Sequence, residues 1–202
     1  TGLRTEYFSG DQCGIVTDEC FGEARPLMNV TKQQVKEKLE KIFEDGMIVV
    51  VTGFIGATQE GHTTTLGRDG SDLTATILGV ALQVDEVWIW KDTNGLMTAD
   101  PKTEPSAKTI PLLSYSEAME MAYFGAKAIQ AKALELACEG RLPIRIKNTF
   151  NLHSPGTLIV QKPHVQSKNV VKAVTIINNV ALITVSGGGM VGVPSVAAKA
   201  FA

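Results

Sequence analysis

The sequence has few of the residues that mark disulfide-rich, metal-binding, membrane or nucleic-acid-binding proteins. Its three cysteines and three histidines show neither the paired spacing of a disulfide framework nor that of a metal site. A reducing, cytoplasmic compartment is therefore expected. No run of about 20 apolar residues could cross a bilayer. A net charge of −2, without a Lys/Arg cluster, provides no basic surface for nucleic acid.

The composition and the order of apolar segments are typical of a globular α/β protein. Of the 202 residues, 44% are hydrophobic and 20% are charged. Strands are predicted at 3–8, 13–17, 47–52, 86–90, 144–148 and 157–160. Helices are predicted from a Thr31–Gln34 capping box to Gly46, over 71–82, from a Ser114–Glu117 capping box to Tyr123, and over 126–139. This alternation predicts a largely parallel sheet with helices packed on it.

The predicted domain organisation depends on a polar stretch towards the C-terminus. Residues 1–160 are expected to form one domain, 161–172 a linker, and 173–202 the incomplete start of a second domain. This last part has predicted strands at 173–177 and 180–185, then a glycine-rich turn and a helix, and is too short to bury a core alone. Because the chain has no initiating Met, its N-terminus is expected to be trimmed.

The most informative polar segment is 63–72, which lies between a predicted strand and a predicted helix. A helix N-terminus that follows glycines offers unpaired backbone N–H groups and a positive dipole end to an anion. Arg68 could bind a carboxylate or phosphate through two hydrogen bonds, and Asp72 could hold an ammonium group. A surface turn in which Ser71 only caps the helix is equally compatible with these residue types.

A second charged segment, 90–102, directly follows a predicted strand. The C-terminal ends of strands face the ligand in open α/β sheets. Lys91, Asp92 and Lys102 could therefore contact nucleotide phosphates, ribose or metal-bound water. The alternative is a plain loop with turns at Asn94–Gly95 and Asp100–Pro101.

Lys127 is a third candidate for an anion contact. It lies at the start of a predicted helix, where a lysine is unfavourable unless an anion is near. A solvated surface lysine is the alternative. The segment Gly187–Gly192 lacks the Gly-Lys-Ser/Thr ending of a phosphate loop, so a tight turn or a small-ligand regulatory site is expected there.

Five segments together resemble the aspartokinase branch of the amino acid kinase family. They are VTGFIG at 51–56, TTTLGRDGSD at 63–72, WKDTNGLMTADPK at 90–102, SEAMEMAYFGAK at 116–127 and IRIKNTF at 144–150. The tail, 180–201, resembles the first strand, turn and helix of an ACT regulatory domain. The resemblance implies the C-terminal part of a carbamate-kinase-like three-layer αβα sandwich, followed by the start of a ferredoxin-like ACT domain.

The resemblance also implies an activity and the residues that perform it. The activity is phosphoryl transfer from ATP, with Mg²⁺, to the side-chain carboxylate of L-aspartate, the first step of lysine, threonine and methionine biosynthesis. Arg68 and Ser71 would bind aspartate, with Asp72 near its amino group, and Lys127 would neutralise phosphate charge. The implied ATP contacts are Gly53, Gly56, Lys91, Asp92, Met97 and Lys102. No protein metal site is implied, whereas a lysine or threonine effector and a homo-oligomer formed through the ACT region are.

The chain also departs from the family pattern. It has no counterpart of the N-terminal Lys-Phe-Gly-Gly-Thr-Ser segment, whose lysine stabilises the transition state, or of a later glycine–glutamate segment. Asp69 replaces a usual glycine, Lys91 a common threonine or serine, Met97 a usual tyrosine, and Ile129-Gln130-Ala131 a usual Leu-His-Pro. Because losing such a lysine costs orders of magnitude in rate, the chain alone is expected to be inactive. The alternative is a non-catalytic regulatory or assembly subunit that binds an amino-acid effector.

Overall fold

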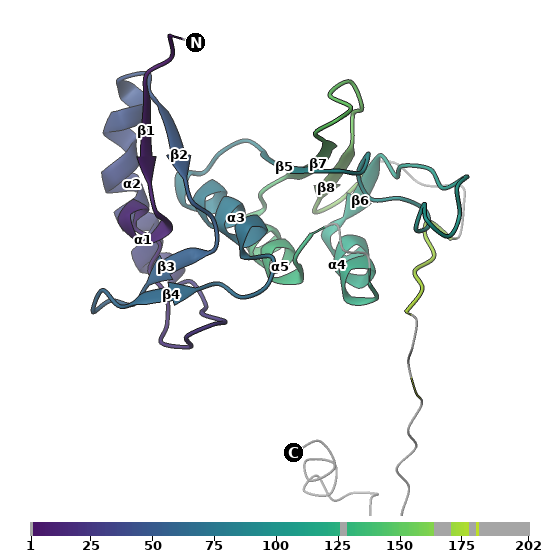
Figure 1. Ribbon diagram of the computed structural model, residues 1–202, viewed down its shortest axis with the longest axis horizontal. Helices are drawn as coiled ribbons and strands as arrows, with labels where there is room; N and C mark the ends of the chain where they lie inside the picture. The colour runs from purple at the N-terminus through teal and green to yellow at the C-terminus, as the bar shows by residue number, and fades with distance from the viewer. Residues whose placement is uncertain (1, 126–128, 164–170, 178–180, 182–202) are drawn as a thin grey trace, which may run out of the picture.

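The described part of the chain is a mixed α/β structure. The computed structural model describes residues 2–125, 129–163, 171–177 and 181. In chain order its elements are β1 (Thr5–Phe8), α1 (Gly10–Cys13), α2 (Met28–Glu44), β2 (Ile48–Val51), β3 (Ile55–Ala57), β4 (Thr63–Thr65), α3 (Gly70–Leu82), β5 (Val87–Lys91), β6 (Leu112–Ser114), α4 (Tyr115–Tyr123), α5 (Ala131–Gly140), β7 (Ile144–Asn148) and β8 (Thr157–Val160). Their arrangement is shown in Figure 1.

The largest sheet has the strand order β5–β7–β8–β6. β5 is parallel to β7 and β6 to β8, whereas β7 and β8 are antiparallel. Along β7, Ile144 and Ile146 are buried while Arg145 and Lys147 lie on the opposite face, as the two-residue period of a strand requires. In Figure 1 helices α3, α4 and α5 all lie on one side of this sheet. The predicted three-layer sandwich has a second layer of helices on the opposite face of the sheet. The described residues form no such layer there.

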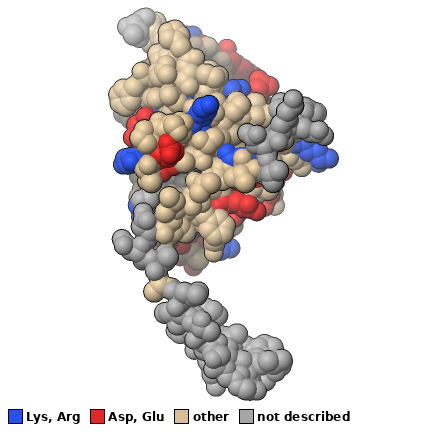
Figure 2. Space-filling model, turned by 90° about the vertical axis from the view of Figure 1, so that its right-hand side faces the viewer, with Lys and Arg blue, Asp and Glu red and all other residues tan. Residues whose placement is uncertain are grey.

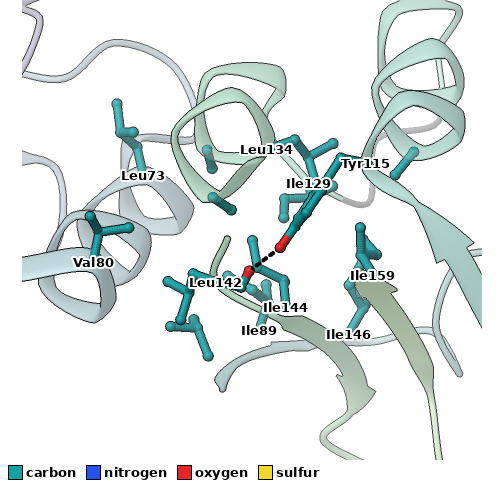
Figure 3. Close-up of a cluster of buried hydrophobic side chains, with 14 of the residues drawn as sticks. Leu73, Val80, Ile89, Tyr115, Ile129, Leu134, Leu142, Ile144, Ile146 and Ile159 are labelled. Atoms are coloured by element: carbon teal, nitrogen blue, oxygen red, sulfur yellow. Dashed lines mark hydrogen bonds between the residues drawn. The ribbon is translucent and has the colours of Figure 1, made fainter. Parts of the chain in front are cut away.

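The main hydrophobic core fills the space between the sheet and these helices (Figure 3). Leu73 and Ile77 of α3 and Leu134 of α5 pack there against isoleucines of the sheet. Tyr115 places its ring in the same core and donates a hydrogen bond from its hydroxyl to the Leu142 carbonyl, at 2.6 Å. Burial raises the pKa of Tyr115 to about 12, so the hydroxyl keeps its proton and remains a donor.

Helix α4 begins as the sequence predicts. The Ser114 hydroxyl accepts a hydrogen bond from the Glu117 N–H, and the Glu117 carboxylate accepts one from the Ser114 N–H. These reciprocal bonds give an acceptor to two backbone N–H groups at the helix start, those of Ser114 and Glu117. The predicted capping box is therefore confirmed.

The N-terminal residues form a smaller unit around the parallel pair β1–β2. Its buried cluster consists of Cys13, Val35, Leu39 and Ala81. The predicted capping box at Thr31 is wrong, because α2 begins earlier and the Thr31 hydroxyl instead bonds both backbone groups of Val16 at 3.0 Å. β2 was expected to be buried, yet only alternate residues point inward, and Val50 is 56% exposed.

Three further predictions differ from the structure. The expected strand at 13–17 does not form: Cys13 is the last residue of α1, which Ser9 and Gln12 start with a capping box, and only single bridges form at Val16 and Thr17. α5 begins at Ala131 rather than near 126. Residues 173–177 have no regular secondary structure. The short strands β3, β4 and β6 were not predicted, and the features predicted at 180–202, apart from residue 181, lie outside the described residues.

Residues 171–177 lie against the domain formed by the preceding chain. The Val174 N–H donates a hydrogen bond to the Thr98 carbonyl at 2.9 Å. The Lys172 ammonium bonds the Glu117 carboxylate at the start of α4. A groove of about 640 Å³ lies between this segment and residues 108–112. We call residues 171–177 the strap, because its contacts join the loop after β5 to α4.

In the part of the chain that the structure describes, no helix is long and apolar enough to span a bilayer. Figure 2 shows Lys and Arg side chains interspersed with Asp and Glu on the face in view. This face therefore offers no continuous basic patch.

Candidate functional site

The candidate site lies where the loop after β2 meets the first turn of α3. Gly53 packs so closely there that a Cβ atom would come within 2.6 Å of the Ser71 Oγ. The Phe54 N–H donates to the Thr74 Oγ1 at 2.9 Å, and that hydroxyl donates to the Gly70 carbonyl. Phe54 has a φ of 76°, a conformation that L-residues rarely adopt. These contacts fix the position of the α3 N-terminus.

The three residues predicted to bind aspartate have very different surroundings. The Arg68 side chain is 88% exposed, and its nearest carboxylate is that of Asp69, at 4.0 Å. Ser71 is also exposed, on the first turn of α3. Asp72 is buried, with only 10% of its side chain exposed. The arrangement thus combines an accessible guanidinium with a carboxylate shielded from solvent.

Asp72 is paired with Lys91, the last residue of β5. The Lys91 ammonium lies 3.1 Å from one carboxylate oxygen of Asp72 and 3.0 Å from the other. The lysine side chain is itself only 26% exposed. A buried carboxylate requires such a partner, because an unpaired charge is costly in a low-dielectric environment. The structure therefore brings together two candidate residues that the sequence analysis had assigned to different ligands.

The remaining candidates occupy the loop that continues from β5. Asp92 follows Lys91 directly and is exposed, as is Lys102, whose N–H donates to the Asp100 carboxylate. Met97 is half-buried and forms a single bridge with Thr109. No described contact joins Met97 or Lys102 to Asp72. Among these candidates, Lys91 is the one with a described bond to α3, through Asp72.

Buried hydroxyl and amide groups hold this loop against the sheet. The Thr157 Oγ1 accepts a hydrogen bond from the Leu96 N–H at 2.8 Å and donates one to the Ile110 carbonyl at 2.7 Å. The Asn148 amide donates to the Asn94 Oδ1 at 2.8 Å. Gly95 has a φ of 117°, and a Cβ there would overlap the Thr157 hydroxyl. The path of the loop is thus determined by β7 and β8.

One other predicted residue, Gly56, lies apart from this arrangement. Gly56 belongs to β3 and allows close packing against Thr17, whose methyl group would be 2.8 Å from a Cβ at that position. Its closest neighbours are therefore packing residues rather than Ser71 or Asp72. Lys127 lies outside the described residues. Within those residues, no group of three or more His, Cys, Asp or Glu side chains could hold a metal ion.

Similarity to known proteins identifies the family of this chain. The sequence profile described as "Amino acid kinase family" matches residues 3–148. The chain belongs to the amino acid kinase family. Within this family it is similar to Aspartokinase 1, chloroplastic, of Arabidopsis thaliana, with 34% identity over 201 residues, covering 99% of this chain and 35% of the relative.

Solved structures of family members agree with the fold. The structure of E. coli aspartokinase III in complex with aspartate and ADP is 33% identical, has a TM-score of 0.76, and matches 80% of this chain and 36% of its own length. A carbamate kinase from Giardia lamblia is 13% identical with a TM-score of 0.54, covering 79% of this chain and 62% of the other. It shares the fold alone. The chain spans about a third of the length of these aspartokinases.

Sequence reasoning missed one residue that touches the candidate site of this amino acid kinase. The Gln130 amide nitrogen donates to the Arg68 carbonyl at 2.7 Å and so ties the start of α5 to the loop before α3. The two residues are 62 positions apart, and no periodicity or spacing connects them. The unusual Ile-Gln-Ala sequence at 129–131 was the only signal at this place.

Proposed function

We propose that this chain is the part of an aspartokinase that binds L-aspartate and contributes to nucleotide binding. The reaction is phosphoryl transfer from ATP to the aspartate side-chain carboxylate. The observation that carries the proposal is the buried carboxylate of Asp72 on the first turn of α3, which follows the exposed Arg68 closely along the chain. This arrangement provides opposite charges for the two ends of an amino acid that carries an ammonium and two carboxylates.

Each aspartate-binding residue has a distinct part in this proposal. Arg68 is exposed and can bind a substrate carboxylate through two hydrogen bonds. Ser71 adds a hydroxyl beside Gly53, and the N-terminus of α3 contributes its positive dipole end. Asp72 holds the ammonium group. Phosphoryl transfer depends mainly on such positioning and charge neutralisation.

The nucleotide contacts are proposed along the loop after β5. Lys91 and Lys102 would bind phosphate oxygens, with Asp92 and Met97 beside them, and Gly53 and Gly56 are proposed as nucleotide contacts by the matched motif alone. We propose Lys127 as a further phosphate ligand by the matched motif. Mg²⁺ bound to ATP phosphates would supply charge neutralisation, and the exposed carboxylate of Asp92 is the kind of oxygen donor it accepts.

We also propose how the protein is regulated and how its subunits assemble, on the basis of its similarity to aspartokinases. E. coli aspartokinase III has been solved in complex with lysine and aspartate, and its structure is 34% identical to this chain over 80% of it. We therefore propose a lysine or threonine effector, with residues 173–202 as the start of an ACT region through which subunits pair. The three cysteines are free, consistent with a reducing compartment such as the cytoplasm, although the Arabidopsis relatives are named chloroplastic.

Calorimetric titration with L-aspartate and with succinate tests the aspartate site. Succinate has both carboxylates but no ammonium group. Asp72→Asn should weaken aspartate binding at least tenfold and leave succinate binding nearly unchanged, because only the ammonium contact is lost. Asp85→Asn, at an exposed position, is the matched control. Equal effects of Asp72→Asn on both ligands would contradict the assigned role.

A second set of titrations separates the kinase from the alternative. Binding of aspartate or ADP supports the kinase assignment, whereas binding of lysine or threonine alone favours a non-catalytic regulatory subunit. A hydroxamate assay with ATP and aspartate measures turnover. Turnover by these 202 residues alone would contradict the prediction that a transition-state lysine outside them is required.

A further inference from the structure

Arg68 extends into solvent from a loop with an uncommon backbone conformation. Its side chain is 88% exposed, so neighbouring side chains do little to fix its direction. Gly67 before it has a φ of 79°, and Asp69 after it has a φ of 57°. L-residues rarely adopt such a φ, and among the described residues the Asp69 side chain makes no capping bond to α3. The direction of the Arg68 side chain therefore depends on what holds the backbone of this loop.

The Gln130 side chain holds that backbone from a neighbouring helix. Its amide nitrogen donates to the Arg68 carbonyl at 2.7 Å. The backbone of Gln130 is itself fixed, because its carbonyl accepts hydrogen bonds from the Ala133 and Leu134 N–H groups at the start of α5. Ala133 and Leu134 have no exposed surface and belong to the main hydrophobic core. A firmly packed helix start is thus joined to the loop through one amide group.

The other polar atom of the Gln130 amide gains no hydrogen bond from its position. The Oε1 atom is buried and has no donor among the described residues. A buried acceptor without a donor opposes folding, and such groups are rare enough in native proteins to require an explanation. An apolar side chain of the same length would avoid this penalty. The bond from the amide nitrogen to Arg68, rather than packing, therefore accounts for a glutamine at this position.

We propose that Gln130 is a positioning residue for substrate binding, which holds the Arg68 carbonyl so that the guanidinium meets a substrate carboxylate in the correct orientation. The inference rests on the proposed function, in which Arg68 binds a carboxylate and Asp72 the ammonium group. A guanidinium binds a carboxylate through two hydrogen bonds only in a restricted orientation. Loss of the Gln130 bond should therefore weaken the carboxylate contact, because binding must then order the loop.

Titration of Gln130→Met with L-aspartate, succinate and ADP tests this role. Methionine keeps the length of the side chain but cannot donate a hydrogen bond. The affinities for aspartate and succinate should fall by the same factor, at least about threefold, because one hydrogen bond to the loop is lost. ADP binding should not change, because Arg68 is not assigned to the nucleotide. Gln33→Met makes the same chemical change at an exposed position of α2 and is the matched control.

Thermal unfolding distinguishes positioning from a merely structural role. The bond to Arg68 is accessible to solvent, so water can replace the lost donor at the carbonyl. Methionine also removes the buried Oε1 atom that has no donor among the described residues. Gln130→Met should therefore unfold at the same temperature as the unmodified chain or at a higher one, although it binds aspartate less tightly. A lower unfolding temperature with unchanged affinity for aspartate and succinate would overturn the proposal.

A double-mutant cycle determines whether Gln130 acts through Arg68. In the Arg68→Ala background there is no guanidinium to position, so Gln130→Met should cause no further loss of succinate affinity. Losses that simply add would show that the two residues act independently. Gln130→Glu, which has the same shape but no N–H donor at neutral pH, should repeat the effect of Gln130→Met on binding. Circular dichroism verifies that each variant is folded.

The outcomes separate this inference from the proposed function. If Gln130→Met and the unmodified chain bind aspartate and succinate equally well, the positioning role is wrong and the proposed function stands. If Gln130→Met loses affinity for aspartate but not for succinate, Gln130 acts on the ammonium contact and the inference is also wrong. If the unmodified chain binds neither these ligands nor ADP, both the inference and the proposed function fail.

Discussion

The two hydrophobic clusters of this chain differ in how completely they are enclosed. In the larger cluster, the inward residues Ile144, Ile146 and Ile159 have no exposed surface. Beside the smaller cluster, β1 and β2 leave Tyr7 84% and Val50 56% exposed. The difference predicts that stability in the described structure is concentrated around the four-stranded sheet.

Helix α3 belongs to both clusters. Leu73, Ile77 and Val80 pack in the larger cluster and Ala81 in the smaller one. The first turn of the same helix carries Ser71 and Asp72. The candidate site is therefore anchored mainly by the larger cluster, and four substitutions test this comparison.

The largest effect is expected for Ile146→Ala in the centre of the sheet. The substitution removes buried methylene groups and leaves a cavity between β7 and the helices, which should cost about 2–5 kcal/mol of unfolding free energy. Urea denaturation followed by circular dichroism measures the loss. A cost below about 1 kcal/mol would mean that the larger cluster is not the main source of stability.

Thr157→Val should have the next largest effect. It preserves the side-chain shape but leaves the buried Leu96 N–H without its acceptor, at a cost of about 1–3 kcal/mol. Thr157→Ser retains the hydroxyl and is the control. Thermal unfolding compares the two variants, and an equal loss in both would show that the hydroxyl bonds are unimportant.

Glu86→Gln should remove about 1 kcal/mol at neutral pH. The Arg145 guanidinium bonds the Glu86 carboxylate and holds its pKa below the ordinary value of 4.5, despite the opposing effect of burial. Because the folded-state pKa is lowered, this contribution is complete above about pH 4.5 and is lost as pH falls through the folded-state pKa.

Urea titrations from pH 7 to 3 check this dependence. The difference between wild type and Glu86→Gln should shrink as the pH falls, whereas Glu60→Gln, at an exposed position, should show almost none at any pH. A difference that grows towards acid pH would contradict the sign of the pKa change.

The smallest effect is expected for Val50→Thr in β2. The side chain is more than half exposed and the substitute is also β-branched, so the unfolding free energy should change by less than about 0.5 kcal/mol. A loss of 2 kcal/mol or more, measured by urea denaturation, would reveal that this face is covered in solution, as buried side chains cost that much.

Local patterns predicted the elements whose signals lie within a few residues. β7 and β8 have the predicted bounds, because isoleucines alternate with charged residues in β7 and β8 is a short apolar run, and the Ser114–Glu117 capping box sets the start of α4. The capping box predicted at Thr31 is wrong, because the Thr31 hydroxyl accepts a hydrogen bond from the Val16 N–H, 15 residues away, rather than from its own helix. Strands of three residues, such as β4, are too short to show a period.

The candidate site was predictable as a set of residues but not as a set of contacts. Arg68, Asp72 and Lys91 were recognisable from charge at the ends of predicted elements. The pairing of Asp72 with Lys91 depends on how α3 packs against β5, and the bond from Gln130 to Arg68 depends on how α5 packs against α3. Both are tertiary contacts, which a local pattern does not specify.

The strap joins the C-terminal part of the described chain to two distant segments. Val174 is fastened to the carbonyl of Thr98, one residue beyond Met97, and Lys172 is fastened to Glu117. The strap therefore links the position of the C-terminal segment to that of the loop that carries Met97 and Lys102.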